Sequence, residues 1–405
     1  MLHTSIARNH AAALGVASLL CALATACHRT DFPQYAAGYR EYAYVSNGAS
    51  NTVAVMDLVN RRQDRVIAVG QQPSGLAVNP VLNEVYVVNT QPTLGDGSVS
   101  VIDAAHNRVA AVIPVRRLPY SIDVDAAGAF AYVANSGSNN VSVIDLKKRR
   151  EIAVIGAGEQ PGLARIAPDM RSLVVTNRGS GSISIYAVDT TAAKPLRLRA
   201  TFSGCTGATD AIILPDSSKT FIACTGANKV MAISLAAAPD SWAAKQDVGA
   251  LTDHLLTLLD VGKSPVQLAL KPDGGELFAV NFDSDSVSEV STWTNEVSDT
   301  FPIGQHPVFG VVSADNSLLW VSNFGADTLS TYSIDDGKLV NVTHVGVGPD
   351  ALAFSAEGHL LLAADAKSGD VSVVRTQEQR GPGLFDMWPS GGQPNSIVVK
   401  AFSAK

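Results

Sequence analysis

The amino-acid sequence predicts an all-β protein, a β-propeller of four-stranded blades, and three observations lead to this prediction. A motif of the type Tyr-Val-x-Asn returns about every 42 residues along the chain. Turn-forming residues separate short apolar runs about every 8–12 residues, as expected for short antiparallel strands. Aromatic residues make up only 6% of the chain, whereas Val, Ala, Ser and Gly are abundant, and this composition suits closely packed strands joined by tight turns.

The Tyr-Val-x-Asn motif is expected to form one strand of each blade. Each copy is followed by a polar turn and a strand such as 141–145, and then by a charged turn and a strand such as 151–155. A Gly-x-x-Pro turn such as 158–161 then leads into a short inner strand, because proline suits the first residue of such a strand. The copies, some of them degenerate, lie at 44–47, 86–89, 132–135, 174–177, 221–224, 278–281, 320–323 and 361–365.

The two ends of the repeat array complement each other. The first copy has no Gly-x-x-Pro strand before it, whereas residues 392–399 supply an unused inner strand after the last copy. If this C-terminal strand joins the first blade, the ring is closed and no open sheet edge remains. Eight blades are favoured. Seven blades are the alternative, because seven is the commonest number for this repeat type and the copy at 361–365 is degenerate.

The N-terminal residues 1–26 are interpreted as a lipoprotein signal peptide. Arg8 precedes the apolar run 11–24, which is too short to span a bilayer but suits the core of a signal peptide. The run leads into Ala24-Thr25-Ala26-Cys27, which resembles the bacterial lipoprotein signal, in which the cysteine is lipidated. The alternative is ordinary cleavage after Ala26, which leaves Cys27 unmodified.

These features predict a bacterial cell-envelope protein that is attached to a membrane through a lipid on Cys27. Residues 27–42 are expected to be a tether and residues 43–405 the propeller. The periplasmic side of the outer membrane is favoured, because His28 stands where the inner-membrane retention signal has Asp. Nucleic acid is excluded as a partner, since the net charge is −7 and the one basic run, 147–150, lies in an expected turn.

The cysteines predict one disulfide. Cys21 lies in the signal peptide and Cys27 is the lipidation candidate, which leaves Cys205 and Cys224. The repeat register places both of them at the same rim of the propeller, and the periplasm permits disulfides. A reactive thiol pair and two free thiols are the alternatives.

The repeat from Tyr44 to Val399 resembles the YVTN-family β-propeller repeat of bacterial and archaeal surface and periplasmic proteins. The superfamily to which this resemblance points includes surface-layer proteins, lactonases and the haem d1 domain of nitrite reductase. The resemblance implies the propeller fold over nearly the whole mature chain. It implies no single activity, because one fold carries many functions.

Candidate site residues follow from aligning the inner strands on their prolines. Asp123 and Arg165 fall at equivalent positions of consecutive blades, so they are expected to meet across a blade interface. The first interpretation is an ion pair that fixes blade packing, and the second is a ligand-binding pair. His306 at the channel rim is a candidate base or metal ligand, although a solvated histidine is the simpler interpretation. Three further candidates near this rim are Tyr120, Asp210 and Asp350.

Three functions remain open. The sequence contains no phosphate-binding loop, no HExxH, no GxSxG and no spaced set of metal ligands, so no metal and no cofactor are predicted. This lack of a catalytic constellation favours a non-enzymatic envelope scaffold that binds a protein or a small ligand at the channel rim. The alternatives are a periplasmic lactonase-like hydrolase and a protein that handles a tetrapyrrole or a similar cofactor.

Overall fold

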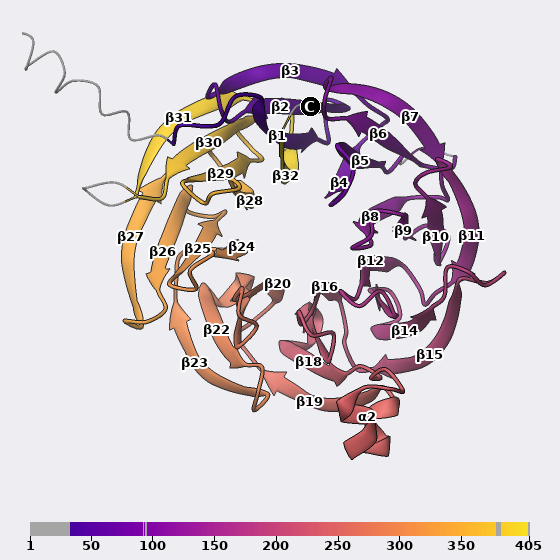
Figure 1. Cartoon of the computed structure of the whole chain (residues 1–405). Coiled ribbons are helices and arrows are strands. Elements are labelled where there is room, and N and C mark those ends of the chain that lie inside the picture. The colour runs from indigo at the N-terminus through magenta and orange to yellow at the C-terminus, as the bar shows by residue number, and fades with distance from the viewer. Residues whose placement is uncertain (1–32, 92, 94, 378–381, 404–405) are drawn as a thin grey trace, which may run out of the picture. The chain divides into compact units, whose positions relative to one another are not determined.

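The computed structural model describes residues 33–403 apart from 92, 94 and 378–381. The predicted signal peptide and Cys27 therefore lie outside the described residues. The chain divides into two units, residues 1–37 and 38–405. The described residues of the first unit, 33–37, contain no helix or strand. The described part of the second unit forms eight four-stranded antiparallel sheets around a ring (Figure 1). The eight-bladed propeller is thus confirmed, and the seven-bladed alternative is wrong.

We number the blades in chain order and give the strands of each blade from the centre of the ring outwards. Blade 1 consists of β32 (Pro394–Ser403), β1 (Tyr39–Asn47), β2 (Thr52–Asp57) and β3 (Arg62–Ala68). Blade 2 consists of β4 (Pro73–Val78), β5 (Glu84–Asn89), β6 (Ser98–Asp103) and β7 (Arg108–Pro114). Blade 3 consists of β8 (Pro119–Val124), β9 (Phe130–Asn135), β10 (Asn140–Asp145) and β11 (Arg150–Gly156). Blade 4 consists of β12 (Pro161–Ile166), β13 (Ser172–Asn177), β14 (Ser182–Val188) and β15 (Leu196–Ser203).

The second half of the ring repeats this pattern. Blade 5 consists of β16 (Ala208–Ile213), β17 (Lys219–Cys224), β18 (Lys229–Ser234) and β19 (His254–Asp260), and blade 6 of β20 (Pro265–Leu270), β21 (Glu276–Asn281), β22 (Ser286–Ser291) and β23 (Glu296–Pro302). Blade 7 consists of β24 (Pro307–Val312), β25 (Leu318–Asn323), β26 (Thr328–Ser333) and β27 (Lys338–His344). Blade 8 consists of β28 (Pro349–Phe354), β29 (Leu360–Asp365), β30 (Asp370–Arg375) and β31 (Gly383–Pro389). The short helices are η1 (Thr225–Ala227), α2 (Trp242–Gln246), η2 (Val248–Leu251) and η3 (Phe282–Ser284).

The core lies between neighbouring blades, and this explains the repeated motif. The second strand of a blade is covered on both faces, so Tyr44, Tyr86 and Tyr132 are almost completely buried. Tyr86 packs in a cluster with Val99 of its own blade and Val133 of the next. Burial of each such side chain contributes about 1.5–3 kcal/mol. The aromatic and β-branched residues of the motif are therefore what the fold requires.

The regular spacing of Asn and Gly in the repeat has one shared cause. The Asn that ends the motif strand is buried, and the amide of Asn89 donates to the hydroxyls of Ser98 and Ser100 at 3.0 and 2.9 Å. The Gly-x-x-Pro turn passes directly over this amide: a Cβ on Gly70 would lie 2.6 Å from the Cβ of Asn89. Such an approach excludes any side chain. The motif Asn and the Gly of the turn are therefore regularly spaced along the repeat because they contact each other in the fold.

The ring is closed by the C-terminal strand, as the sequence predicts. The innermost strand of blade 1 is β32, which pairs with β1 from Tyr39 with Ser403 to Asn47 with Pro394, and Figure 1 shows the first and last strands side by side. Because β32 extends to Ser403, β1 already begins at Tyr39. Residues 39–42 of the expected tether therefore lie in the first blade.

The predicted disulfide is confirmed: Cys205 and Cys224 are bonded, with their Cα atoms 4.7 Å apart. Both cysteines are fully buried. Cys224 stands where other blades carry the motif Asn, so the covalent bond replaces the amide contacts of that position. Closing a loop with a sequence separation of 19 stabilises the fold by roughly 2–4 kcal/mol.

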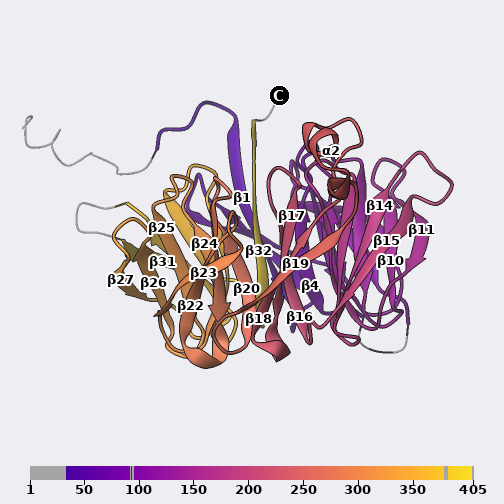
Figure 2. The ribbon, with the colours of Figure 1, turned by 90° about the horizontal axis from the view of Figure 1, so that it is seen from below.

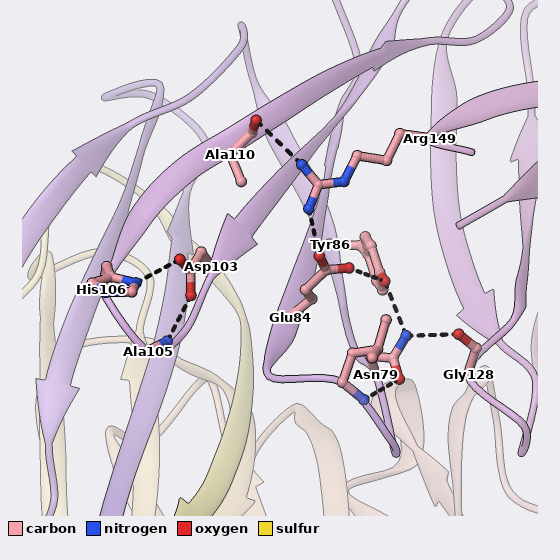
Figure 3. Close-up of polar contacts among 10 residues, drawn as sticks. Asn79, Glu84, Tyr86, Asp103, Ala105, His106, Ala110, Gly128 and Arg149 are labelled. Carbon is pink, nitrogen blue, oxygen red and sulfur yellow. Dashed lines mark hydrogen bonds and ion pairs between the residues drawn. The ribbon is translucent and has the colours of Figure 1, made fainter. Parts of the chain in front are cut away.

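Blades 2 and 3 are joined by a polar clamp (Figure 3). The amide of Asn79 donates to the Tyr86 hydroxyl and to the Gly128 carbonyl, both at 3.0 Å, and its oxygen accepts from two backbone N–H groups. At the surface, the Arg149 guanidinium reaches Glu84 at 2.8 Å and the Ala110 carbonyl at 3.4 Å. The hydrogen bonds of Asn79 to Tyr86 and Gly128 are buried, whereas the contacts of Arg149 are half exposed.

This difference in burial gives a stability prediction. Asn79→Ala leaves the two backbone donors and the Gly128 carbonyl without partners inside the protein, so we expect a loss of about 2–4 kcal/mol. Arg149→Ala is the matched comparison within the same clamp. Since water can replace a half-exposed ion pair, its expected loss is below about 1 kcal/mol. Urea denaturation midpoints check both values, and an equal loss in the two variants would contradict the assignment.

Candidate functional site

The central channel contains a cavity with a volume of about 920 Å³. This volume lies within the usual range for small-molecule sites, roughly 300–1,000 Å³. The inner strands supply the wall, because they are the strands that face the ring centre (Figure 1). The polar lining residues are Tyr120, Asp123, Arg165, Thr209, Asp210, Gln267, Asp350 and Asn395.

Five of the six site candidates from the sequence line this cavity, and the predicted strand register is confirmed. Asp123 pairs with Tyr132 and Arg165 with Val174, at equivalent places of their blades. The candidates come together because the ring brings inner strands of distant sequence to one channel. The exception is His306, which does not line the cavity.

Asp350 is the most unusual of these residues. It is the second residue of β28 and follows Pro349, so it lies at the end of the channel where the inner strands begin. Burial raises the pKa of its carboxyl group to about 6. No side chain or backbone group of the described residues donates a hydrogen bond to this carboxylate, whereas its backbone carbonyl accepts from Ser322 at 3.1 Å. A partly buried carboxylate that faces a cavity without a hydrogen-bond donor is a functional-site candidate.

The expected pair of Asp123 and Arg165 takes a different form. The Asp123 carboxylate accepts from the backbone N–H of Ile166 at 3.0 Å and of Val124 at 3.1 Å, so both of its oxygens are occupied. The nearest acid to Arg165 is Asp210 of the following blade, at 3.9 Å. Burial raises the pKa of Asp123, and the Arg165 guanidinium offsets part of this shift. Arg165 thus lies between two carboxylates.

Tyr120 and His306 belong to the rim of the channel. The Arg178 guanidinium lies over the Tyr120 ring at 4.1 Å, a favourable cation–π contact. His306 is exposed, and its ring centre is 4.6 Å from that of Phe282. Its φ of 46° is not a local distortion, because the residue before the proline has a positive φ in other blades too, for example Gln72 and Leu118. The backbone conformation of His306 is therefore a feature of the repeated turn before the inner strand.

Several lining residues were not predicted from the sequence. Gln267 accepts from the Gly310 N–H at 2.8 Å and donates to the Leu268 carbonyl at 2.7 Å, and it bridges two blades in this way. Asn395 donates to the Pro73 carbonyl at 2.9 Å across the closure of the ring. Both lie one or two residues after the alignment proline. A polar side chain one or two residues after this proline is therefore the sequence signal that could have identified Gln267 and Asn395 as lining residues.

No group of three or more His, Cys, Asp or Glu side chains in the described residues is arranged to hold a metal ion. No helix in the part of the chain that the structure describes is long and apolar enough to cross a membrane.

Fold and cavity together define an eight-bladed propeller with a ligand-sized central channel. The family model "Lactonase, 7-bladed beta-propeller" matches residues 311–394, a segment that includes Asp350. The chain has one blade more than the description of that family. A search of curated proteins found no match.

Solved structures show the same fold at low sequence identity. The dihydro-haem d1 dehydrogenase NirN, in complex with DHE, has a TM-score of 0.70 at 16% identity, over 93% of this chain and 78% of that one. A Bacteroides fragilis protein described as a candidate 6-phosphogluconolactonase has a TM-score of 0.59 at 15% identity, over 91% and 100% of the two chains. Kuenenia stuttgartiensis hydrazine synthase has a TM-score of 0.54 at 21% identity, over 82% and 92%.

Proposed function

We propose that this protein is a lactonase-like hydrolase that binds a cyclic ester in the central cavity, with Asp350 as its general base. The observation that carries the proposal is the Asp350 carboxylate: it lines the cavity, has no hydrogen-bond donor among the described residues, and has a pKa raised to about 6 by burial. A base whose pKa lies near the working pH is the most effective one. The lactonase family match over residues 311–394 supports the choice of reaction.

The proposed reaction needs one water molecule and no other reactant. Asp350 accepts a proton from water while the water oxygen attacks the ester carbonyl carbon. The ring C–O bond then breaks, and the leaving alkoxide takes up the proton, so that the product is a hydroxy acid. Arg165 stands on blade 4, four blades along the ring from Asp350 on blade 8. Its guanidinium is the cationic group of the lining, and it can bind an oxygen of the substrate or product.

The direct test is hydrolysis of a panel of γ- and δ-lactones by the purified full chain. We expect kcat/KM to rise with pH through about 6 and to level off above it, because Asp350 must be ionised to act as a base. Acid release is followed by pH-stat titration. If no lactone in the panel is hydrolysed faster than in buffer, the proposed function is wrong.

A tetrapyrrole is the second candidate ligand, and the specific observation is the similarity to NirN over 93% of this chain. The cavity supports it less well. Its lining contains a single arginine, and His306 lies outside it. An absorption spectrum together with native mass spectrometry of the protein purified from its host distinguishes the two. A visible band with a matching added mass would favour the tetrapyrrole.

The envelope location belongs to the same proposal. The sequence around Cys27 supports lipidation, and the Cys205–Cys224 disulfide fits an oxidising compartment. β1 begins at Tyr39, at the end of the blade opposite Pro394 and Asn47, whereas Asp350 lies at the proline end of its strand. Figure 2 shows the start of β1 and the end of β32 on one side of the ring, together with α2.

Replacing the anchor residue tests this part of the proposal. Cys27→Ala removes the thiol that carries the lipid, so we expect the protein to move from the membrane to the soluble fraction of the cell envelope. Fractionation and intact-mass analysis provide the measurement, with Cys21→Ala, in the expected signal peptide, as the control that keeps both Cys27 and the disulfide. Membrane association that persists in Cys27→Ala would contradict lipidation as the mode of attachment.

A further inference from the structure

The charged groups of the cavity are unevenly placed around its lining. Inner strands β8, β12 and β16 contribute Asp123, Arg165 and Asp210, together with apolar residues such as Leu163 and Ile212. Strands β20 and β24 of blades 6 and 7, together with the start of η3, contribute no charged group, and Gln267 is the polar side chain that they add to the lining. We call their other lining residues the apolar wall: Val266, Leu268, Leu270, Phe282, Val308 and Phe309.

The apolar wall is a departure from the pattern of the other blades. At the position after the alignment proline, blades 6 and 7 carry Val266 and Val308. The other blades carry Ser74, Tyr120, Gly162, Thr209, Asp350 and Asn395 at this position. Both valines are only partly buried, so they offer apolar surface to the cavity. Removing such surface from water is favourable, and a ligand with an apolar part can supply the cover.

The wall borders the proposed base. The Ser322 hydroxyl lies 3.1 Å from the Asp350 carbonyl and 3.3 Å from the Phe309 carbonyl. One hydroxyl can be this close to both only if β28 and β24 lie against each other at this level. A substrate whose ester group reaches Asp350 can therefore place a neighbouring substituent on Val308 and Phe309.

The charges of the lining disfavour an anionic substrate. Three carboxylates, Asp123, Asp210 and Asp350, face the cavity, and Arg165 already lies 3.9 Å from one of them. A phosphate group would meet more negative than positive charge in a partly dehydrated space, which is unfavourable.

We infer that the substrate is an uncharged lactone with an apolar substituent, which lies along the apolar wall, rather than a phosphorylated sugar lactone. This inference rests on the proposed function and deepens it. Val308, next to Asp350 on the neighbouring blade, is the residue that sets the preference.

Binding to the Asp350→Asn variant tests the preference without turnover. Calorimetry with γ-lactones from γ-hexalactone to γ-decalactone is expected to give a dissociation constant that falls roughly fourfold for each added methylene, as burial of apolar surface implies. Glucono-δ-lactone and 6-phosphogluconate are expected to bind at least about tenfold more weakly than γ-decalactone. A dissociation constant that does not change with chain length would overturn the inference.

Val308→Lys provides the second test. A cation in the apolar wall is expected to weaken γ-decalactone binding about tenfold and to strengthen 6-phosphogluconate binding. The matched control is Val342→Lys, which adds the same charge to an exposed valine of outer strand β27 and is expected to change neither. Circular dichroism confirms that both variants are folded.

The outcomes separate the two claims. Hydrolysis by the wild type with a preference for phosphorylated or sugar lactones would overturn the inference and leave the proposed function in place. Chain-length-dependent binding without hydrolysis of any lactone would overturn the proposed function, and the apolar wall would remain a binding surface. Lack of binding by every probe would overturn both.

Discussion

Asp350→Asn is expected to lower kcat/KM for lactone hydrolysis by about 100- to 10,000-fold, the usual contribution of a general base. The amide has nearly the same shape as the carboxyl group but cannot take a proton from water. The rise of kcat/KM with pH through about 6 is expected to vanish in the variant, because the group that titrates there has been removed. A pH-stat assay from about pH 4.5 to about pH 8.5, which brackets this pKa, measures both effects.

The same substitution should not weaken the fold. Burial raises the pKa of Asp350, which means that its ionised form is unfavourable in the folded state. The neutral amide avoids this cost, so the thermal midpoint of Asp350→Asn is expected to equal or exceed that of the wild type, as is common for functional residues. Asp299→Asn, on exposed outer strand β23, is the control and is expected to keep full activity. Activity that survives in Asp350→Asn would exclude this residue as the base.

Asp365→Asn is expected to stabilise the protein by roughly 2–4 kcal/mol at pH 8 and to change it little near pH 4. Asp365 ends the motif strand of blade 8, where other blades carry Asn, and it is completely buried. Burial, followed by the negative charge of Asp370, raises its pKa to about 8, although the Ser372 N–H and hydroxyl lower it. The carboxyl group of Asp365 thus lies at a position where the repeat otherwise has the amide of an asparagine.

The sign of this effect follows from proton binding. An unfolded Asp releases its proton near about pH 3.9, whereas the folded protein keeps the proton on Asp365 up to about 8. Between these values the folded state binds more protons than the unfolded state, so stability is fully present below about pH 4 and decreases as the pH rises towards 8. The amide of Asn135 donates to Asn140 and Ser142 at 2.9 and 2.8 Å. The amide that Asp365→Asn introduces can donate in the same way towards Asp370 and Ser372 without titrating.

Urea midpoints of wild type and Asp365→Asn from about pH 4 to about pH 8.5 check this prediction. The reverse exchange is the matched comparison: Asn323→Asp places a carboxyl group at the equivalent position of blade 7, where Asn323 donates to Thr328 and Ser330. This variant is expected to lose stability as the pH rises, opposite to Asp365→Asn. Parallel pH profiles for Asp365→Asn and the wild type would show that Asp365 does not titrate as described.

The candidate site was predicted only in part, and the misses have a physical reason. Alignment on the prolines located Asp123 and Arg165 at equivalent places, which is confirmed, but the salt bridge of Arg165 is with Asp210. A register says which residues are level with each other, not which way a long side chain turns. His306 also illustrates this limit: the alignment located it at the rim, where its ring packs against Phe282 of the cavity lining, but His306 itself does not line the cavity.

The sequence by itself determined the blades, the closure of the ring and the disulfide, because each depends on contacts within one blade or between neighbours in the ring. The motif Asn and the turn Gly, for example, must touch in each unit, so their spacing repeats along the chain. Only the tertiary structure decided which residues of the channel are buried and which of them contact one another. Asp350, Arg165 and Val266 are far apart in sequence, and closure of the ring brings them to one cavity. The burial that raises the pKa of Asp350 exists only after this closure, so no local pattern could reveal it.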